Sequence, residues 1–300
     1  MTGDLGPWRG YLQLLRLPAV FSAWSNVFAG HLIATMGVGE SPRWGLLALQ
    51  IGIATCLYLG GMVLNDCFDL EEDRIQRPSR PLPSGQVPVP SAWRLGFGLL
   101  LAGTALGIVA GGETLWLTLG IAAAVLLYDG VLKAGPLGPL AMGLCRYLNW
   151  LMALSAAPLT QVSLALAAPA LIYTGGVTAL SRAETGGALV GPLRWTWLAL
   201  AGTLATMAGL FLAGGLPEPA GLVAVLILVA FVGVRLLRLR PRGEGAGDAT
   251  LVQAGVRTLL LGMIPLDAAL LLGAGLWVPA LLLPSLLIPA RRLGRWLYLT

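Results

Sequence analysis

Nine apolar segments follow one another along the chain, each close to the roughly 20 residues that carry an α-helix across the hydrocarbon core of a bilayer. They cover residues 14–37, 44–65, 92–111, 114–132, 137–157, 161–181, 193–214, 219–239 and 251–275. The segments are continuously apolar and do not alternate at every second residue, which disfavours a β-barrel. The sequence therefore predicts an all-α fold, a polytopic membrane bundle of about nine transmembrane helices.

The composition agrees with this prediction. Hydrophobic residues make up 57% of the chain, charged residues only 11%, and the mean hydropathy is +0.81. A chain of this kind has too little polar side-chain area to cover a water-soluble globular fold. We expect residues 1–300 to form one transmembrane domain, with four-helix halves at roughly 14–132 and 137–239, followed by a ninth helix and a C-terminal segment.

Basic residues in the connections orient the bundle, because Lys and Arg in short loops are retained on the cytoplasmic side. They gather at the N-terminus and in every second connection, which predicts a cytoplasmic N-terminus and a cytoplasmic acidic loop. Arginine supplies 18 of the 19 basic residues, which favours a bacterial inner membrane as the location. The basic residues concerned are Arg9, Arg16, Arg74, Arg77, Arg80, Arg94, Lys133, Arg182, Arg194, Arg235, Arg238, Arg240 and Arg242.

The C-terminal segment departs from this alternation. Arg291, Arg292 and Arg295 follow a ninth crossing that should end outside, after an apolar stretch broken by three prolines. We expect nine crossings with a partly inserted C-terminal segment. A tenth crossing is the alternative that satisfies the charge bias.

The net charge of +5 does not indicate a nucleic-acid partner. The arginines lie beside the apolar segments, where they anchor topology and meet the anionic headgroups of the lipid bilayer. Cys56, Cys67 and Cys145 form no C-x-x-C pair, so we expect small buried side chains without a redox or metal role.

The most highly charged part of the chain, Asn65–Gly85, begins where the second apolar segment ends. Asn65, Asp66, Asp69 and Asp73 recur at helical spacings, so a helix through them would present their oxygens on one face. Crowded oxygen ligands suit Mg²⁺, which proteins hold through a few carboxylates together with substrate phosphates. Arginines, which match phosphate oxygens, follow at positions 74, 77 and 80. The stretch predicts a magnesium and diphosphate site at a membrane boundary.

A solvated helix end without function is the alternative interpretation of these acids. Negative charge at a helix C-terminus opposes the helix dipole, and like charges repel, so the placement is unfavourable unless a cation compensates it. We therefore favour a site. Glu71 and Glu72 lie off the predicted face and are expected in solvent, although Glu72 can reach the face from the side.

The stretch resembles the first aspartate motif of the UbiA superfamily of intramembrane prenyltransferases, N-D-x-x-D-x-x-x-D followed by an R-P-x-x-x-G-like loop. The resemblance implies a helical bundle that opens laterally to lipid and transfers a prenyl group from a prenyl diphosphate to an acceptor, which stays unidentified. It further implies that Asp66, Asp69 and Asp73 bind catalytic Mg²⁺, and that Asn65, Arg77 and Arg80 bind the substrate. The matching residues are Asn65, Asp66, Asp69, Asp73, Arg77, Arg80, Pro81, Leu82 and Gly85.

A second element, YDGVLK, follows the fourth apolar segment and is similar to the Y-x-x-x-x-K element of the same superfamily. The resemblance implies that Tyr128 and Lys133 help to bind the diphosphate. On its own the pattern is weak, because a lysine at the end of a span more often anchors topology. Asp129 is unusual in this element, and either pairs with Lys133 or adds a ligand.

The chain departs from the superfamily pattern after the sixth segment, where catalytic members carry a second D-x-x-x-D motif for a second Mg²⁺. Here the residues read LSRAETGG, and only Glu184 is acidic. Glu184 is expected to complete a single-metal site and to take part in catalysis. Arg182 either contacts the diphosphate in place of the lost cation or forms an exposed pair with Glu184, which would contribute little.

This departure keeps a second function open. The altered motif resembles the EboC-like branch of the superfamily, which implies a non-catalytic, isoprenoid-binding component of a membrane transport or export system, with partner proteins from the same operon. Pyrophosphate release from a prenyl diphosphate separates the two functions. An enzyme releases it, whereas a binding component only retains the ligand.

Polar residues inside the apolar segments are the remaining candidates, because ionisable groups at membrane depth are costly and usually mark a site. Ser22, Ser25 and Asn26 form a polar stripe in the first segment, and Asn26 is the strongest candidate to line an acceptor pocket. Small polar residues also hold membrane helices together, which is the alternative for the serines. Arg146 and Asn149, one turn apart in the fifth segment, are expected to bind substrate.

Overall fold

The computed structural model describes residues 8–184, 188–239 and 248–294. Within these ranges the chain is helical, and no β-strand is present. Arg240, Arg242 and Arg295, which contributed to the topology argument, lie outside the described residues.

Nine long helices stand where the apolar segments predict them, with bounds that differ from the expected ones by at most a few residues. They are α2 (Leu17–Met36), α3 (Trp44–Phe68), α5 (Val89–Ala110), α6 (Gly112–Leu127), α7 (Gly138–Leu154), α8 (Gln161–Ser181), α9 (Val190–Leu212), α10 (Pro219–Leu236) and α11 (Ala249–Gly273). Eight of them, α6 with its continuation to Leu132, are long and apolar enough to cross a membrane. The exception is α7, which has 17 residues. The protein is a multi-pass membrane protein with an all-helical bundle fold.

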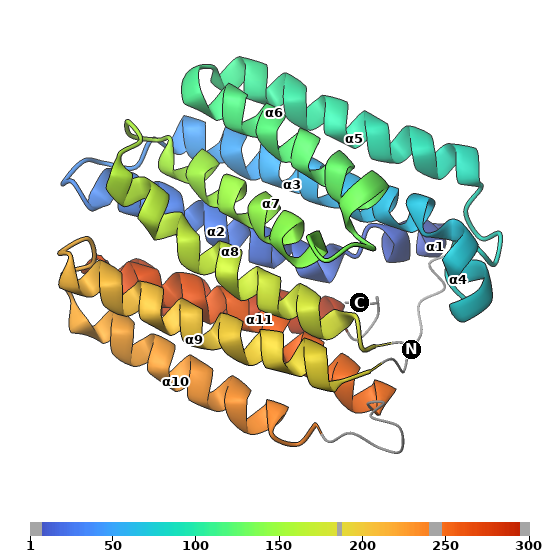
Figure 1. Cartoon of the computed structure of the whole chain (residues 1–300). Coiled ribbons are helices and arrows are strands. Elements are labelled where there is room, and N and C mark those ends of the chain that lie inside the picture. The colour runs from blue at the N-terminus through green and yellow to red at the C-terminus, as the bar shows by residue number, and fades with distance from the viewer. Residues whose placement is uncertain (1–7, 185–187, 240–247, 295–300) are drawn as a thin grey trace.

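The helices lie side by side, and their order in the bundle decides which of them can line an interior site (Figure 1). Helices α3, α5, α6 and α7 pack in sequence, as do α8, α9, α10 and α11. The two groups meet where α7 packs on α8 and where α2 contacts α3, α7 and α11. The most apolar window of α2 is 78% buried and that of α11 67%, against 22–33% for α5, α6, α9 and α10. Helices α2 and α11 therefore form the centre of the bundle, and the outer four present apolar side chains to lipid.

The first apolar segment forms one helix, α2, and a further short helix precedes it. A short helix α1 (Trp8–Leu14) ends before Arg16, and α2 begins at Leu17 with a proline in its first turn. Arg16 has φ 46° and ψ 45°, the left-handed region that costs a side-chain-bearing residue about 1–2 kcal/mol. Its guanidinium lies 2.6 Å from the carboxylate of Asp66, and this ion pair offsets the backbone strain.

The second apolar segment extends one turn further than predicted. Helix α3 ends at Phe68, and a short helix α4 (Leu70–Gln76) starts after Asp69, which forms the junction between them. The sequence pattern predicted one continuous helix through the acidic residues. Because the helix is interrupted, the acids before and after Asp69 do not keep a single helical phase.

The C-terminal segment forms three short consecutive helices, α12 (Trp277–Leu282), η2 (Leu283–Leu286) and α13 (Leu287–Leu293). They pack against α11 and α2. None of the three has the length of a membrane span, so among the described helices a tenth crossing finds no support.

Candidate active site

A cavity of about 620 Å³ opens between α2, α3, α6, α7, α8 and α11. Its inner wall is apolar and comes from the middle of these helices, for example Leu57 of α3, Val125 of α6 and Met263 of α11. Its other end, which we call the polar end, is formed by residues at the ends of α3, α6 and α8 and in the following loops. The polar end consists of Asn65, Asp69, Glu72, Asp73, Arg77, Arg80, Asp129, Lys133, Arg182 and Glu184.

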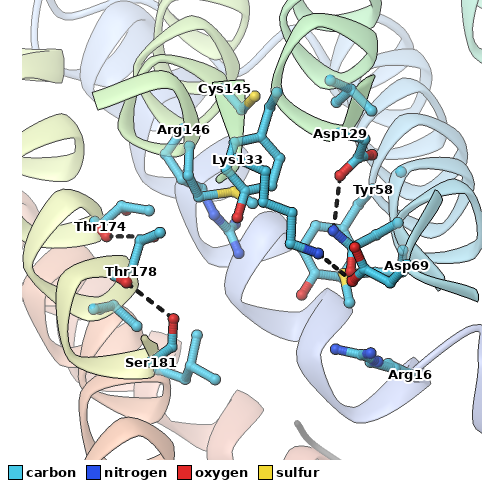
Figure 2. A pocket seen from close by; sticks show the side chains of 18 of the residues that line it. Arg16, Tyr58, Asp69, Asp129, Lys133, Cys145, Arg146, Thr174, Thr178 and Ser181 are labelled. Carbon is cyan, nitrogen blue, oxygen red and sulfur yellow. Dashed lines mark hydrogen bonds and ion pairs between the residues drawn. The ribbon is translucent and has the colours of Figure 1, made fainter. Parts of the chain in front are cut away.

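Asp69 and Lys133 meet across the polar end of the cavity. The ammonium group of Lys133 pairs with a carboxylate oxygen of Asp69, and this contact joins the end of α6 to the end of α3 (Figure 2). Both side chains line the cavity and are only partly exposed, Lys133 at 31% and Asp69 at 17%. The structure thus brings the predicted acidic motif and the predicted lysine element together.

Asp73 and Arg80 form the second pair at this end. Nη1 of Arg80 lies 2.7 Å from one carboxylate oxygen of Asp73, and Nη1 of Arg77 lies 3.6 Å from the other. The Asp73 side chain is 2% exposed, so its charge is compensated within the protein. Asp73 lines the cavity together with both arginines.

Asp66 occupies a different position from the one the motif predicts. Its carboxylate faces Arg16 at 2.6 Å and Arg80 at 3.6 Å, and it is not among the residues that line the cavity. Nη1 of Arg80 also contacts Asp73 at 2.7 Å, so the two carboxylates share one guanidinium across the junction at Asp69. In this structure Asp66 pairs with Arg16 and Arg80, and it does not line the cavity.

The lysine element is wound as a π-helix, η1 (Tyr128–Leu132), at the end of α6. The backbone N–H of Lys133 donates to the carbonyl of Tyr128, five residues earlier, at 2.9 Å. This wider turn brings Tyr128, Asp129 and Lys133 to the cavity wall together. Isolated π-turns inside helices are frequent at functional sites.

Asp129 does not pair with Lys133, the first of the two predicted alternatives. The side-chain amide of Asn65 donates to one of its carboxylate oxygens at 2.8 Å, while Lys133 pairs with Asp69. Asp129 is 9% exposed and lines the cavity, so it adds a carboxylate to the polar end. Asn65 is thereby fixed beside the motif aspartates.

Glu184 is the one acid of the altered second motif, and it reaches the polar end. Its Oε2 lies 3.9 Å from Nη2 of Arg77, whereas its buried Oε1 has no hydrogen-bond partner among the described residues. Burial raises the pKa of Glu184 above its ordinary value, and the guanidinium of Arg77 opposes this. A buried carboxylate oxygen without a partner is costly unless a cation or a proton donor completes it.

The side chain of Arg182 donates hydrogen bonds to backbone carbonyls and forms no ion pair within the described residues. One of its guanidinium nitrogens, Nη2, donates to the backbone carbonyl of Lys133 at 3.2 Å and to that of Gly135 at 2.5 Å. The predicted pair between Arg182 and Glu184 is not formed, because Glu184 faces Arg77 instead. Arg182 also lines the cavity, so it connects the end of α8 to the loop that follows η1.

The described residues contain no group of three or more acids, histidines or cysteines arranged to hold a metal ion. The predicted metal ligands Asp66, Asp69, Asp73 and Glu184 are instead each paired with an arginine or a lysine. The residues nevertheless fit a hard cation, because Asp69, Asp73 and Glu184 face one cavity with carboxylate oxygens and one oxygen of Glu184 is unpaired.

A second polar network lies deeper in the bundle, below the polar end. Arg146 donates to the hydroxyl of Ser22 at 2.8 Å and to the side-chain carbonyl of Asn26 at 3.2 Å, and its guanidinium lies 5.1 Å from the ring centre of Tyr58. Arg146 and Asn149 line the cavity, as predicted for substrate-binding residues. Asn26 does not, because it faces α7 and α11 behind the wall.

Asp267, on α11, anchors this network and was missed by the sequence analysis. Its carboxylate accepts hydrogen bonds from Ser25, from Asn26 at 2.9 and 2.8 Å, and from the indole of Trp150 at 3.2 Å. It is 1% exposed. The signal was available, because an aspartate inside the ninth apolar segment is costly without partners and marks a candidate site.

Comparison with solved structures identifies the class to which this fold belongs. The chain superposes on a structure of digeranylgeranylglyceryl phosphate synthase with a TM-score of 0.64 and 20% identity, over 89% of this chain and 98% of that chain. It superposes on a UbiA homolog from Archaeoglobus fulgidus, bound to DMAPP and Mg²⁺, with a TM-score of 0.62 and 18% identity, over 87% and 98%. At these identities the likeness defines the fold, an intramembrane helical bundle shared with UbiA homologs.

The sequence itself defines the family. Residues 23–183, more than half of the chain, match the UbiA prenyltransferase family, and the protein belongs to this family. A digeranylgeranylglyceryl phosphate synthase from Saccharolobus solfataricus is 34% identical over 125 residues, 42% of this chain and 43% of that protein. Another from Pyrococcus abyssi is 31% identical over 140 residues, 45% and 48% respectively. The matched region thus spans less than half of these archaeal relatives. Two expectations from the sequence, a bacterial source and membership of the EboC-like branch, stay predictions.

Proposed function

We propose that the protein is a Mg²⁺-dependent intramembrane prenyltransferase, which binds a prenyl diphosphate and transfers the prenyl group to an acceptor. One observation carries this proposal. Asp69, Asp73 and Glu184 line the same cavity as Arg77, Arg80 and Lys133, and apolar side chains such as Leu57, Val125 and Met263 line its inner wall. A diphosphate requires the charged side chains, and an isoprenoid tail requires the apolar wall. The archaeal relatives and the DMAPP-bound homolog support the same substrate class.

The charges of the polar end explain why the diphosphate requires a divalent cation. Six basic and five acidic residues line the cavity, so their positive and negative charges nearly balance. A diphosphate that takes the arginines and the lysine as partners separates them from their carboxylates. The freed carboxylates then require a cation of their own. The basic residues are Arg16, Arg77, Arg80, Lys133, Arg146 and Arg182, and the acidic ones are Asp69, Glu72, Asp73, Asp129 and Glu184.

Asp69, Asp73 and Glu184 would hold Mg²⁺, which supplies positive charge to the diphosphate when bound. We assign Asp66 a supporting role, because it lies behind the cavity and fixes Arg16 and Arg80. This differs from the ligand role that the motif predicts for Asp66. It leaves the cavity-facing acids as the proposed ligand set.

The residues of this chain supply the remaining parts of the reaction. Arg77, Arg80 and Lys133 stabilise the negative charge that develops on the diphosphate as its bond to the allylic carbon breaks. The carbon, which gains carbocation character, lies toward the apolar wall, where water is scarce. An acceptor in the deeper part of the cavity, near Tyr58 and Arg146, forms the new bond to this carbon, and the proton that the acceptor loses passes to the released diphosphate.

The location follows from the same arrangement. The polar end of the cavity is formed by the basic connections after α3, α6 and α8, which the positive-inside rule places on the cytoplasmic side. We propose that substrate reaches the site from the cytoplasmic face of a bacterial inner membrane, with its tail in the bundle.

A non-catalytic isoprenoid-binding component is the second candidate function. The altered second motif favours it, since only Glu184 is acidic there and Arg182 is bonded to backbone carbonyls. Binding without turnover distinguishes this function from the first.

The experiment uses purified protein with Mg²⁺ and labelled prenyl diphosphates of several lengths, with a panel of aromatic, alcohol and glyceryl phosphate lipid acceptors. Pyrophosphate release that Asp69→Asn abolishes supports the enzyme. Mg²⁺-dependent binding without release supports the binding component. Absence of binding to any of the diphosphates contradicts both.

A further inference from the structure

Arg182 lies in the altered second motif, and its side-chain hydrogen bonds are with backbone carbonyls. We infer that Arg182 is a positioning residue, which holds the loop after η1 so that Lys133 points into the polar end of the cavity. The inference rests on the proposed function, because Lys133 is the residue that binds the diphosphate there.

The geometry of the guanidinium supports this role. Nη2 of Arg182 donates to the carbonyls of Lys133 and Gly135 together, at 3.2 and 2.5 Å. Lys133 directly follows η1, where the last carbonyls of a helix have no partner within the helix, and Gly135 lies two residues further on, with its carbonyl also accepting the backbone N–H of Gly138 at 3.1 Å. A cation at this end is also favoured by the helix dipole. Arg182 therefore holds the loop after η1 in one conformation.

The backbone–backbone hydrogen bonds of the loop are all local. The sequence Ala134–Gly135–Pro136 follows Lys133, and the backbone N–H of Gly135 bonds only within the same turn, to the carbonyl of Leu132. The guanidinium also packs against Gly138 so closely that an added Cβ would lie 2.5 Å from Nη2. Gly138 thus leaves the space that Arg182 requires to reach both carbonyls.

The position of Lys133 matters because the lysine bridges two parts of the bundle. Its backbone is fixed from α8 by Arg182, and its ammonium group pairs with Asp69 at the end of α3. If the loop relaxed, the flexible side chain would sample other directions, since a lysine has no planar group that sets its orientation. Arg182 therefore couples the altered second motif to the first motif through Lys133.

A double-mutant cycle tests this coupling directly. The measurement is equilibrium dialysis of labelled geranyl S-thiolodiphosphate, which resists turnover, in MgCl₂ with the full-length protein. We expect Lys133→Ala and Arg182→Ala each to weaken binding about tenfold, the effect of one charge-assisted hydrogen bond. The Arg182→Ala/Lys133→Ala variant should bind no more weakly than Lys133→Ala. A further tenfold loss in the double variant would show that Arg182 contacts the diphosphate itself and would overturn the inference.

A conservative variant provides a second criterion. Arg182→Lys keeps the positive charge but cannot donate from one planar group to both carbonyls, so it should bind as weakly as Arg182→Ala. Binding near the wild-type level in Arg182→Lys would indicate charge alone and would contradict positioning. The matched control is Arg43→Ala. Arg43 donates to the backbone carbonyl of Ala156 at 3.1 Å after α7 and does not line the cavity. Its removal should leave binding unchanged.

Lys133 also offers a readout that does not depend on ligand binding, because it is the only lysine of the chain. Reductive ¹³C-methylation labels its ammonium group for NMR, and the label reports the surroundings of that one side chain. We expect Arg182→Ala to shift the Lys133 methyl resonance toward that of an exposed lysine without ligand, and Arg43→Ala to leave it unchanged. A resonance unchanged by Arg182→Ala contradicts the inference. Failure of the wild-type protein to bind the diphosphate contradicts the proposed function separately.

Discussion

Lys133 and Asp69 form an ion pair that joins the end of α6 to the end of α3 across the mouth of the cavity (Figure 2). Each of these groups is a proposed ligand, the lysine for a diphosphate and the aspartate for Mg²⁺. In the protein without ligands they neutralise each other. Arg80 and Asp73 repeat this arrangement at 2.7 Å. Binding of substrate and metal therefore exchanges ion pairs within the protein for contacts with the two ligands.

The first prediction follows from this exchange. Lys133→Gln removes a competitor for the Asp69 carboxylate, so the variant should bind Mg²⁺ more tightly than the wild type when no diphosphate is present. It should bind geranyl diphosphate about tenfold more weakly, because one charge-assisted hydrogen bond is lost. Mn²⁺ titration followed by electron paramagnetic resonance measures the first effect and dialysis the second. Weaker metal binding in Lys133→Gln would contradict the exchange.

The second prediction concerns stability and separates Asp66 from its neighbours. Asp66→Asn leaves Arg16 buried without its counter-ion and in a strained backbone conformation. Breaking a buried pair by removing one partner typically costs about 3–5 kcal/mol. We expect a clear fall in the thermal unfolding midpoint in detergent. The matched control is Glu71→Gln, which removes an exposed pair with Arg74 and should change stability by less than about 1 kcal/mol. Equal midpoints for the two variants would rule out the supporting role of Asp66.

The third prediction concerns the network inside the bundle. Asp267→Ala leaves the donors of Ser25, Asn26 and Trp150 without their common acceptor. Each unpaired buried donor costs about 1–3 kcal/mol, so the variant should be strongly destabilised. Thr174→Val is the control, since the buried Thr174 hydroxyl has no hydrogen-bond partner in the described part of the chain. Its replacement should be neutral or slightly stabilising. A stable Asp267→Ala variant would show that the network does not hold α2, α7 and α11 together.

The fourth prediction tests the apolar wall. Ala54 is 3% exposed and lines the cavity on α3, so Ala54→Phe narrows the space for an isoprenoid tail. Binding of geranyl diphosphate should weaken, whereas binding of inorganic diphosphate, which has no tail, should not change. Competition dialysis with both ligands measures the difference. An equal loss for both ligands would indicate a general distortion of the site and not a tail-binding wall.

The long helices could be predicted from the sequence because burial in lipid imposes one simple requirement, a continuous apolar stretch of span length. The breaks could not. Arg16 adopts its left-handed conformation beside Asp66, a residue 50 positions away. The interruption at Asp69 likewise depends on how α4 turns toward its arginine partners. Such contacts between distant positions leave no local pattern.

The candidate site shows the same division. Asp69 and Asp73 were found by their spacing and Lys133 by the resemblance to the superfamily element, and the structure gathers all three at one cavity. Asp66 and Asn26 are not among the residues that line the cavity, and the roles predicted for them stay predictions. The pattern could not show which helices pack on their faces. Asp267 was missed because no motif includes it. Its partners come from two other helices, and only the folded bundle brings them together.

We propose above all that the carboxylates and the basic side chains of this cavity bind Mg²⁺ and a prenyl diphosphate together. The most direct measurement is equilibrium dialysis of labelled geranyl diphosphate against the wild-type protein and Asp69→Asn, each with Mg²⁺ and with EDTA. We expect saturable binding only for the wild type with Mg²⁺, and at least a tenfold loss, about 1.4 kcal/mol, in the variant. Binding that is equal in EDTA, or unchanged by Asp69→Asn, would contradict it.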